Sequence, residues 1–157
     1  MTLGGGNVGA LTLSGTLGET GGVQTLGVAA NPLLADVRRI TLSGANTFTG
    51  GVRLDSGHLA IANGSALGAR PLVVNGGTLR LSGLTIGNNI VLNRDLVIQS
   101  PGGATQSGVI VGAAGAGLTL RNSASSLTLG GTRTLTPAQR RSTTASRQIS
   151  RRREPGR

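Results

Sequence analysis

The chain carries few side chains that could do chemistry. Of its 157 residues, one is histidine, five are acidic, and none is cysteine, tryptophan or tyrosine. The lack of cysteine excludes disulfides, zinc–thiolate sites and thiol nucleophiles. A Ser-His-Asp site would have to use His58, but Asp55 and Ser56 lie too close to it in sequence to form that geometry on one strand. We therefore expect His58 to be an exposed strand-edge residue, and we predict no catalytic, cofactor-binding or metal-binding residue.

Three acidic residues and one asparagine recur at a nearly constant spacing. Asp36, Asp55, Asn75 and Asp95 follow one another at intervals of about 20 residues. If one structural repeat spans that distance, the four side chains stack as a ladder on successive repeats. Paired carboxylates can cleave glycosidic bonds, so a carbohydrate-active β-helix is one alternative. We favour a polar ladder at a turn and predict that the chain is not an enzyme.

Two further patterns favour turns rather than chemistry. Gly4, Gly6 and Gly9 have the spacing of a dinucleotide-binding loop, but Gly15 would interrupt the helix that such a loop requires. Asn63-Gly64-Ser65 fits a glycosylation sequon and is interpreted first as a turn. No cofactor is expected.

The net charge of +10 is unevenly distributed along the chain. Residues 1–132 hold seven arginines against four acidic residues, whereas residues 133–157 hold eight arginines against Glu154 alone. We therefore predict two parts, a folded region over 1–132 and an arginine-rich tail over 133–157 that is disordered or weakly helical. Such a tail could bind nucleic acid through phosphate contacts, which is a second alternative. Nucleic-acid binding is not favoured, because no aromatic residues interleave the arginines to stack on bases.

The elements that must position these residues are short strands. An aliphatic residue, a small or polar residue and a second aliphatic residue recur as a triplet along the chain. Because side chains alternate along a strand, the two outer residues of each triplet share one face, which we predict to be buried. No helix is expected before residue 136. The outer residues are Leu11/Leu13, Ile40/Leu42, Leu59/Ile61, Leu72/Val74, Leu79/Leu81, Leu84/Ile86, Ile90/Leu92, Leu96/Ile98, Val109/Val111, Leu118/Leu120 and Leu127/Leu129.

The triplets themselves repeat along the chain. Ile40, Leu59 and Leu79 each begin an equivalent triplet, at a nearly constant spacing. A period of about 20 residues marks a solenoid, in which each coil pairs with the coils above and below. We therefore predict an all-β fold, a β-solenoid with about 20 residues per coil. The predicted stacking places Asp55 over Asn75, Gly57 over Gly77, Leu59 over Leu79 and Ile61 over Leu81.

One stretch of the sequence is similar to a known repeat. LSGANTFTGG at 42–51, followed by a GHLAI strand and a GSALG turn, resembles the autotransporter-associated β-strand repeat of bacterial autotransporter passenger domains. The clear match covers about residues 40–83. The resemblance implies a right-handed parallel β-helix at the surface of a Gram-negative cell, acting as a stalk or an adhesin.

The resemblance also carries expectations about partners and processing. It implies contacts with proteins or glycans of a host surface or of neighbouring cells, made by exposed turns rather than by a pocket. It implies membrane attachment only through a translocator barrel, which we do not expect within this chain. The first basic residue is Arg38, too late for a signal peptide, so we expect the chain to be a fragment of an extracellular or outer-membrane parent protein.

Overall fold

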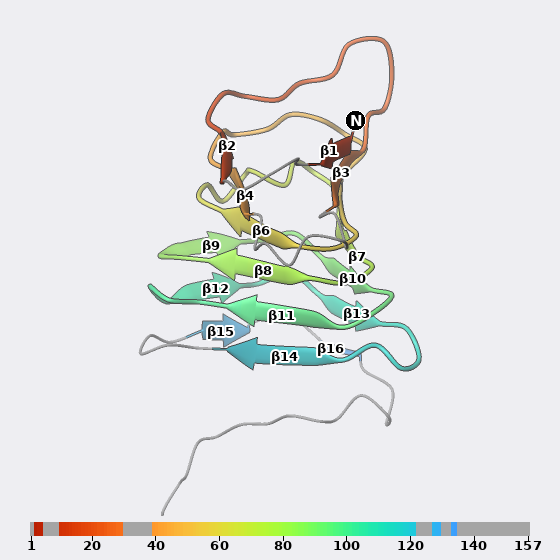
Figure 1. The fold of residues 1–157 in the computed structure, drawn as a ribbon, viewed down its shortest axis with the longest axis vertical. Coiled ribbons are helices and arrows are strands. Elements are labelled where there is room, and N and C mark those ends of the chain that lie inside the picture. The colour runs from red at the N-terminus through yellow and green to blue at the C-terminus, as the bar shows by residue number, and fades with distance from the viewer. Residues whose placement is uncertain (1, 5–9, 30–38, 122–126, 130–132, 135–157) are drawn as a thin grey trace, which may run out of the picture.

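The computed structural model describes residues 2–4, 10–29, 39–121, 127–129 and 133–134, and over these residues every regular element is a β-strand. The strands form three parallel sheets that share one axis (Figure 1). The first sheet contains β1 (Thr2–Gly4), β3 (Leu26–Ala29), β5 (Val52–Leu54), β7 (Leu72–Val74), β10 (Ile90–Leu92), β13 (Ile110–Gly112) and β16 (Arg133–Thr134). The second contains β2 (Leu11–Leu13), β4 (Arg39–Leu42), β6 (His58–Ile61), β8 (Thr78–Leu81), β11 (Leu96–Gln99) and β14 (Leu118–Arg121). The third contains β9 (Leu84–Ile86), β12 (Ala104–Gln106) and β15 (Leu127–Leu129).

Each strand in the interior of a sheet pairs in parallel with its counterparts one coil earlier and one coil later, and each strand at the end of a sheet pairs with one counterpart, which makes the fold a β-solenoid. Figure 1 shows β6, β8, β11 and β14 stacked one above the other. Leu59 pairs with Leu79 and Ile61 pairs with Leu81, so the predicted register and the predicted coil length are confirmed. The earlier coils are longer. Ile40 pairs with Leu59 in the coil that follows and with Leu11 in the coil before, and Leu11 is farther from Ile40 in the sequence than Leu59 is.

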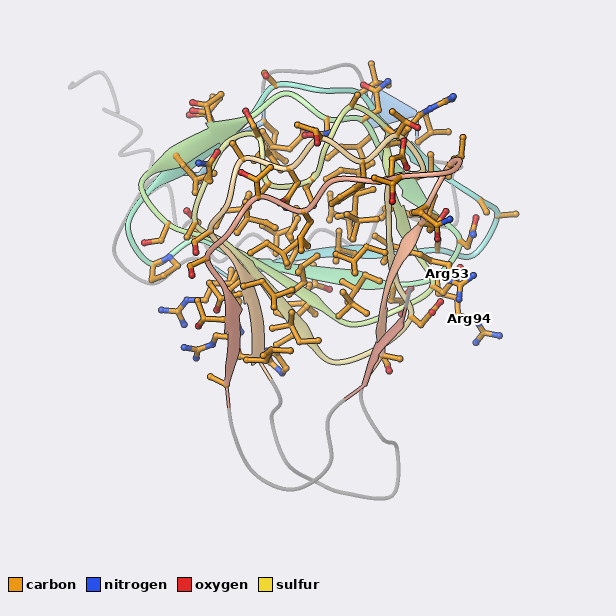
Figure 2. All side chains as sticks on the ribbon, turned by 90° about the horizontal axis from the view of Figure 1, so that it is seen from above. Arg53 and Arg94 are labelled. Atoms are coloured by element: carbon orange, nitrogen blue, oxygen red, sulfur yellow. The ribbon has the colours of Figure 1, made fainter. Side chains whose placement is uncertain are left out.

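The core is a narrow column of aliphatic side chains inside the coils. The view down the axis shows carbon-rich side chains filling the interior (Figure 2). Leu54, Leu59, Leu72 and Leu79 are among the residues with no exposed surface, whereas Leu11, on the outermost strand of its sheet, is exposed and not buried as predicted. A strand of three or four residues buries only about two such side chains, worth about 2 kcal/mol each. One coil therefore cannot offset its loss of backbone entropy, and each coil depends on its neighbours.

The third side of the solenoid changes along the axis. From Leu84 onward it is built by β9, β12 and β15. In the earlier coils the same side is built by the connections over residues 14–25, 43–51 and 62–71, which contain no strand. The connection at 43–51 buries Phe48 and the next one buries Ala66 and Leu67.

The predicted strand pattern is wrong at β13. We expected Val109 and Val111 to face the core, but β13 buries Ile110 completely and leaves Val111 42% exposed. The register explains the shift, because Ile110 pairs with the buried Ile90 of β10. At the end of the first sheet, Ile110 also pairs with Arg133, so the sheet continues past residue 132. The predicted boundary there stays a prediction, and residues 135–157 lie outside the described part of the chain.

Candidate functional site

The polar ladder forms at the corner between the first and second sheets. The Asn75 side-chain amide donates a hydrogen bond to Asp55 Oδ1 at 2.7 Å, as the spacing predicted. The Asn93 amide in turn donates to Asn75 Oδ1 at 2.9 Å. Each of these residues directly follows a strand of the first sheet, so the parallel register brings them together.

Two arginines lie beside this ladder. Arg53 Nε lies 2.9 Å from the Asp55 carboxylate, in an ion pair whose arginine is half exposed. Figure 2 shows Arg53 and Arg94 at the same corner of the coil, with both side chains pointing away from the core. The corner therefore holds one ion-paired carboxylate, two side-chain amides and two guanidinium groups.

The prediction that Asp95 belongs to this ladder is wrong. The coil from β7 to β10 is only 18 residues long, because Val74 pairs with Leu92, and this places Asn93 rather than Asp95 beside Asn75. Asp95 instead accepts a hydrogen bond from the Gly117 N–H at 2.6 Å. Asp36 lies outside the described residues. The described ladder therefore has one carboxylate, whereas glycoside hydrolysis requires two.

His58 does not occupy the exposed strand edge that we expected. It begins β6, which lies between β4 and β8 inside the second sheet, and it is half-buried. It pairs with Thr78, as the sequence alignment of the coils predicted, and with Arg39 on the other side. Burial lowers the pKa of His58, and the positive charge of Arg39 lowers it further. A neutral imidazole is therefore favoured at this position.

The block at 42–51 holds three successive coils together through one side chain. Asn46 is buried; its Oδ1 accepts the Leu17 N–H at 2.8 Å, and its Nδ2 donates to the Ala66 carbonyl at 2.6 Å. The residues at 17, 46 and 66 lie in three consecutive connections of the third side. Backbone hydrogen bonds also join these connections, from the Asn46 N–H to the Ser65 carbonyl and from the Thr47 N–H to the Leu17 carbonyl, and the Asn46 side chain adds two more bonds where the third sheet is missing.

Glu19 ties two of the same connections together. Its carboxylate accepts hydrogen bonds from the Gln24 N–H at 2.7 Å, from the Thr49 N–H at 2.9 Å and from the Thr49 hydroxyl. These bonds, that of the Thr49 hydroxyl first, lower the pKa of Glu19. The Glu19 carboxylate therefore stabilises the coils by linking two connections, which is a structural role.

A shallow groove of about 520 Å³ lies on the third side, near its border with the first sheet. Its walls are the turn at 64–71 and residues 87–89 of the next coil, and Asn46 contributes from the coil before. The sequence did not predict this groove, and the expectation that exposed turns rather than a pocket contact partners stays a prediction. The paired asparagines Asn88 and Asn89 beside a turn were the available signal.

The glycine patterns are structural where they are described. Gly4 ends β1, and Gly6 and Gly9 lie outside the described residues. The sequon at 63–65 forms the predicted turn, because Asn63 Oδ1 accepts the Ser65 N–H at 2.9 Å.

Across the described ranges, no three histidine, cysteine or acidic side chains gather as metal ligands. Within the same ranges, no helix is long and apolar enough to cross a membrane.

One comparison with known proteins gives a match. The chain is 35% identical over 126 residues to the adhesin BmaC autotransporter of Brucella suis biovar 1 (strain 1330), a match that covers 73% of this chain. It spans only 4% of the length of that protein. No family model matches the sequence. No solved structure matches it either. The similarity and the β-solenoid together fit a segment of an autotransporter passenger domain, which confirms the resemblance seen in the sequence.

Proposed function

We propose that this chain is a surface-exposed passenger segment of a bacterial autotransporter, which serves as a stalk or as part of an adhesive surface. The observation that carries the proposal is the continuous stack of parallel coils, combined with the similarity to an autotransporter adhesin. A stack of this kind extends along one axis and exposes the outer faces of its sheets and turns. Those faces are where host-surface or cell–cell partners, proteins or glycans, make contact.

The segment is non-enzymatic in this proposal. The ladder residue Asp55 is ion-paired with Arg53, and its neighbours on the next two coils are neutral amides. Paired carboxylates at the separation that glycosidases need are therefore missing from the described corner. Incubation of the full chain with labelled polysaccharides should release no new reducing ends. Release that Asp55→Asn abolishes would overturn this part of the proposal.

The location is tested on intact cells of the bacterium that makes the chain. Antibodies against the chain should label unpermeabilised cells, and brief treatment with external protease should remove the label. A cytoplasmic protein measured in the same cells should stay intact as the control. A label that appears only after permeabilisation would contradict the proposal.

The adhesive role has a separate readout. Beads coated with the full chain should bind to epithelial cells or to the bacteria themselves more than beads coated with the heat-denatured chain. Equal binding of both kinds of bead would leave the stalk role as the proposed function, because a spacer needs no partner of its own.

A further inference from the structure

The groove on the third side offers hydrogen-bonding groups that the fold does not use. The Arg70 Nε donates to the Thr49 carbonyl at 3.2 Å, while its two terminal nitrogens have no partner among the described residues. Asn89 uses its Oδ1 to accept the Val109 N–H at 2.8 Å, which leaves its NH₂ group available. Ser65 adds a hydroxyl on the same wall.

The groove is also cationic. None of the described residues that line it is acidic, and Arg70 supplies a positive charge. Asp55 is ion-paired with Arg53 and follows β5 at the corner with the second sheet. The Glu19 carboxylate lies beside Thr49, whose N–H and hydroxyl it binds, but within the described residues it forms no ion pair with Arg70. A guanidinium group with free terminal nitrogens binds a carboxylate through two parallel hydrogen bonds.

The walls of the groove are held in place from behind. The Asn88 amide donates to the carbonyls of Gly68 and Arg70, both at 2.9 Å, which fixes the backbone that carries the arginine. The backbone carbonyl of Asn88 in turn accepts a hydrogen bond at 2.9 Å from the side-chain amide of the fully buried Gln106. Because the backbone that carries the binding groups is already held in place, binding a ligand costs less conformational entropy.

We infer that this groove binds the carboxylate group of an acidic saccharide. Arg70 receives the carboxylate, the Asn89 amide and the Ser65 hydroxyl bond the ring hydroxyls, and the Pro71 ring offers a small apolar surface. The size of the groove, about 520 Å³, suits a ligand of one to two sugar rings. The inference deepens the proposed function, on which it rests for the presence of such saccharides at a cell surface.

The test measures binding of small acidic sugars to the full folded chain. Sialyllactose represents host glycans, digalacturonate represents uronic-acid polysaccharides, and lactose is the neutral control. Small sugars are used because the arginine-rich chain would attract any polyanion through its net charge of +10. Titrations are followed by calorimetry for the wild type, for Arg70→Gln and for the matched control Arg94→Gln. Circular dichroism checks that each variant keeps its β-structure.

At least one acidic sugar should bind at least about tenfold more tightly than lactose. That binding should weaken at least about tenfold in Arg70→Gln and stay unchanged in Arg94→Gln. Binding of sialyllactose alone would assign the ligand to host glycans, and binding of digalacturonate alone would assign it to uronic-acid polysaccharides. No acid-dependent binding up to about 10 mM, or equal loss in both variants, would overturn the inference. The surface location is tested separately on intact cells, so a failure of the proposed function can be distinguished from a failure of this inference.

Discussion

At the scale of single residues, the buried Asn46 is the polar side chain that joins three consecutive connections of the third side. Its carboxamide satisfies the Leu17 N–H and the Ala66 carbonyl, which belong to the coils before and after it. Replacing Asn46 with alanine leaves both backbone groups without a partner. The bond to the Ala66 carbonyl is buried and the bond from the Leu17 N–H is part-buried. A buried backbone group without a partner costs about 1–3 kcal/mol, so we expect Asn46→Ala to lower the free energy of unfolding by about 1–3 kcal/mol.

Urea unfolding followed by circular dichroism measures this loss. Asn93→Ala is the matched control, because Asn93 is exposed and its side chain makes one hydrogen bond to the neighbouring coil, to Asn75. The control should lose no more than about 1 kcal/mol. Equal losses in the two variants would contradict the role given to Asn46.

His58 makes a second prediction at the residue scale, about pH. Burial first, and Arg39 second, lower the pKa of His58 below its ordinary value of 6.5. The unfolded chain therefore takes up the proton more readily than the folded chain, so stability is full above pH 6.5 and falls as the pH drops below it. His58→Thr, which copies the residue at position 78, should remove this slope. Urea midpoints between about pH 5 and pH 8 measure it, and an unchanged slope in the variant would contradict the assignment.

At the scale of elements, the sequence predicts strands where two aliphatics flank a small or polar residue. The rule succeeds at β6 and β8, where Leu59 and Leu79 pair as expected. It fails at β12, because Ala104–Gln106 has no aliphatic pair and becomes a strand only through pairing with β9 and β15. It also misplaces β13, because three consecutive aliphatics from Val109 to Val111 allow two registers, and only the neighbouring coil chooses between them.

The candidate site was less predictable than the strands. The contact between Asp55 and Asn75 follows from a regular spacing of 20 residues. The contact between Asn75 and Asn93 depends on one coil being 18 residues long, and extending the regular spacing along the sequence does not predict this shorter coil. The groove is harder still, because its residues come from three coils and its shape depends on how turns of unequal length stack.

Turns stack closely enough to make glycine obligatory at some positions. A Cβ added at Gly44 would lie 2.1 Å from the Gly15 carbonyl oxygen of the previous coil, far inside van der Waals contact. Gly44→Ala must therefore push the two coils apart, and we expect a loss of about 1–3 kcal/mol in the free energy of unfolding. Gly15→Ala is the control, because a Cβ there meets nothing within 4 Å. Urea unfolding compares the two, and a Gly44 variant as stable as its control would show that the turns do not stack as described.

At the scale of the whole molecule, the solenoid is a one-dimensional chain of coils. The fully buried Leu79 of β8 sits between β6 and β11, and strands further along the sheet touch β8 only through these two neighbours. In such an array, stability is the sum of the terms within coils and the terms between nearest neighbours. Damage at one coil should therefore weaken the adjacent coils first and fade with distance along the axis.

Hydrogen exchange of the full chain tests this coupling. In the wild type we expect the backbone amides of β6 and β8 to be the most protected, and those of β2, the outermost strand of its sheet, to be less protected. Leu79→Ala should cost about 3 kcal/mol and lower the protection of β6, β8 and β11 together while changing β2 least. If protection instead fell by the same amount in every strand, the described coils would unfold as a single cooperative unit, and local coupling between neighbours would not govern the stability of this solenoid.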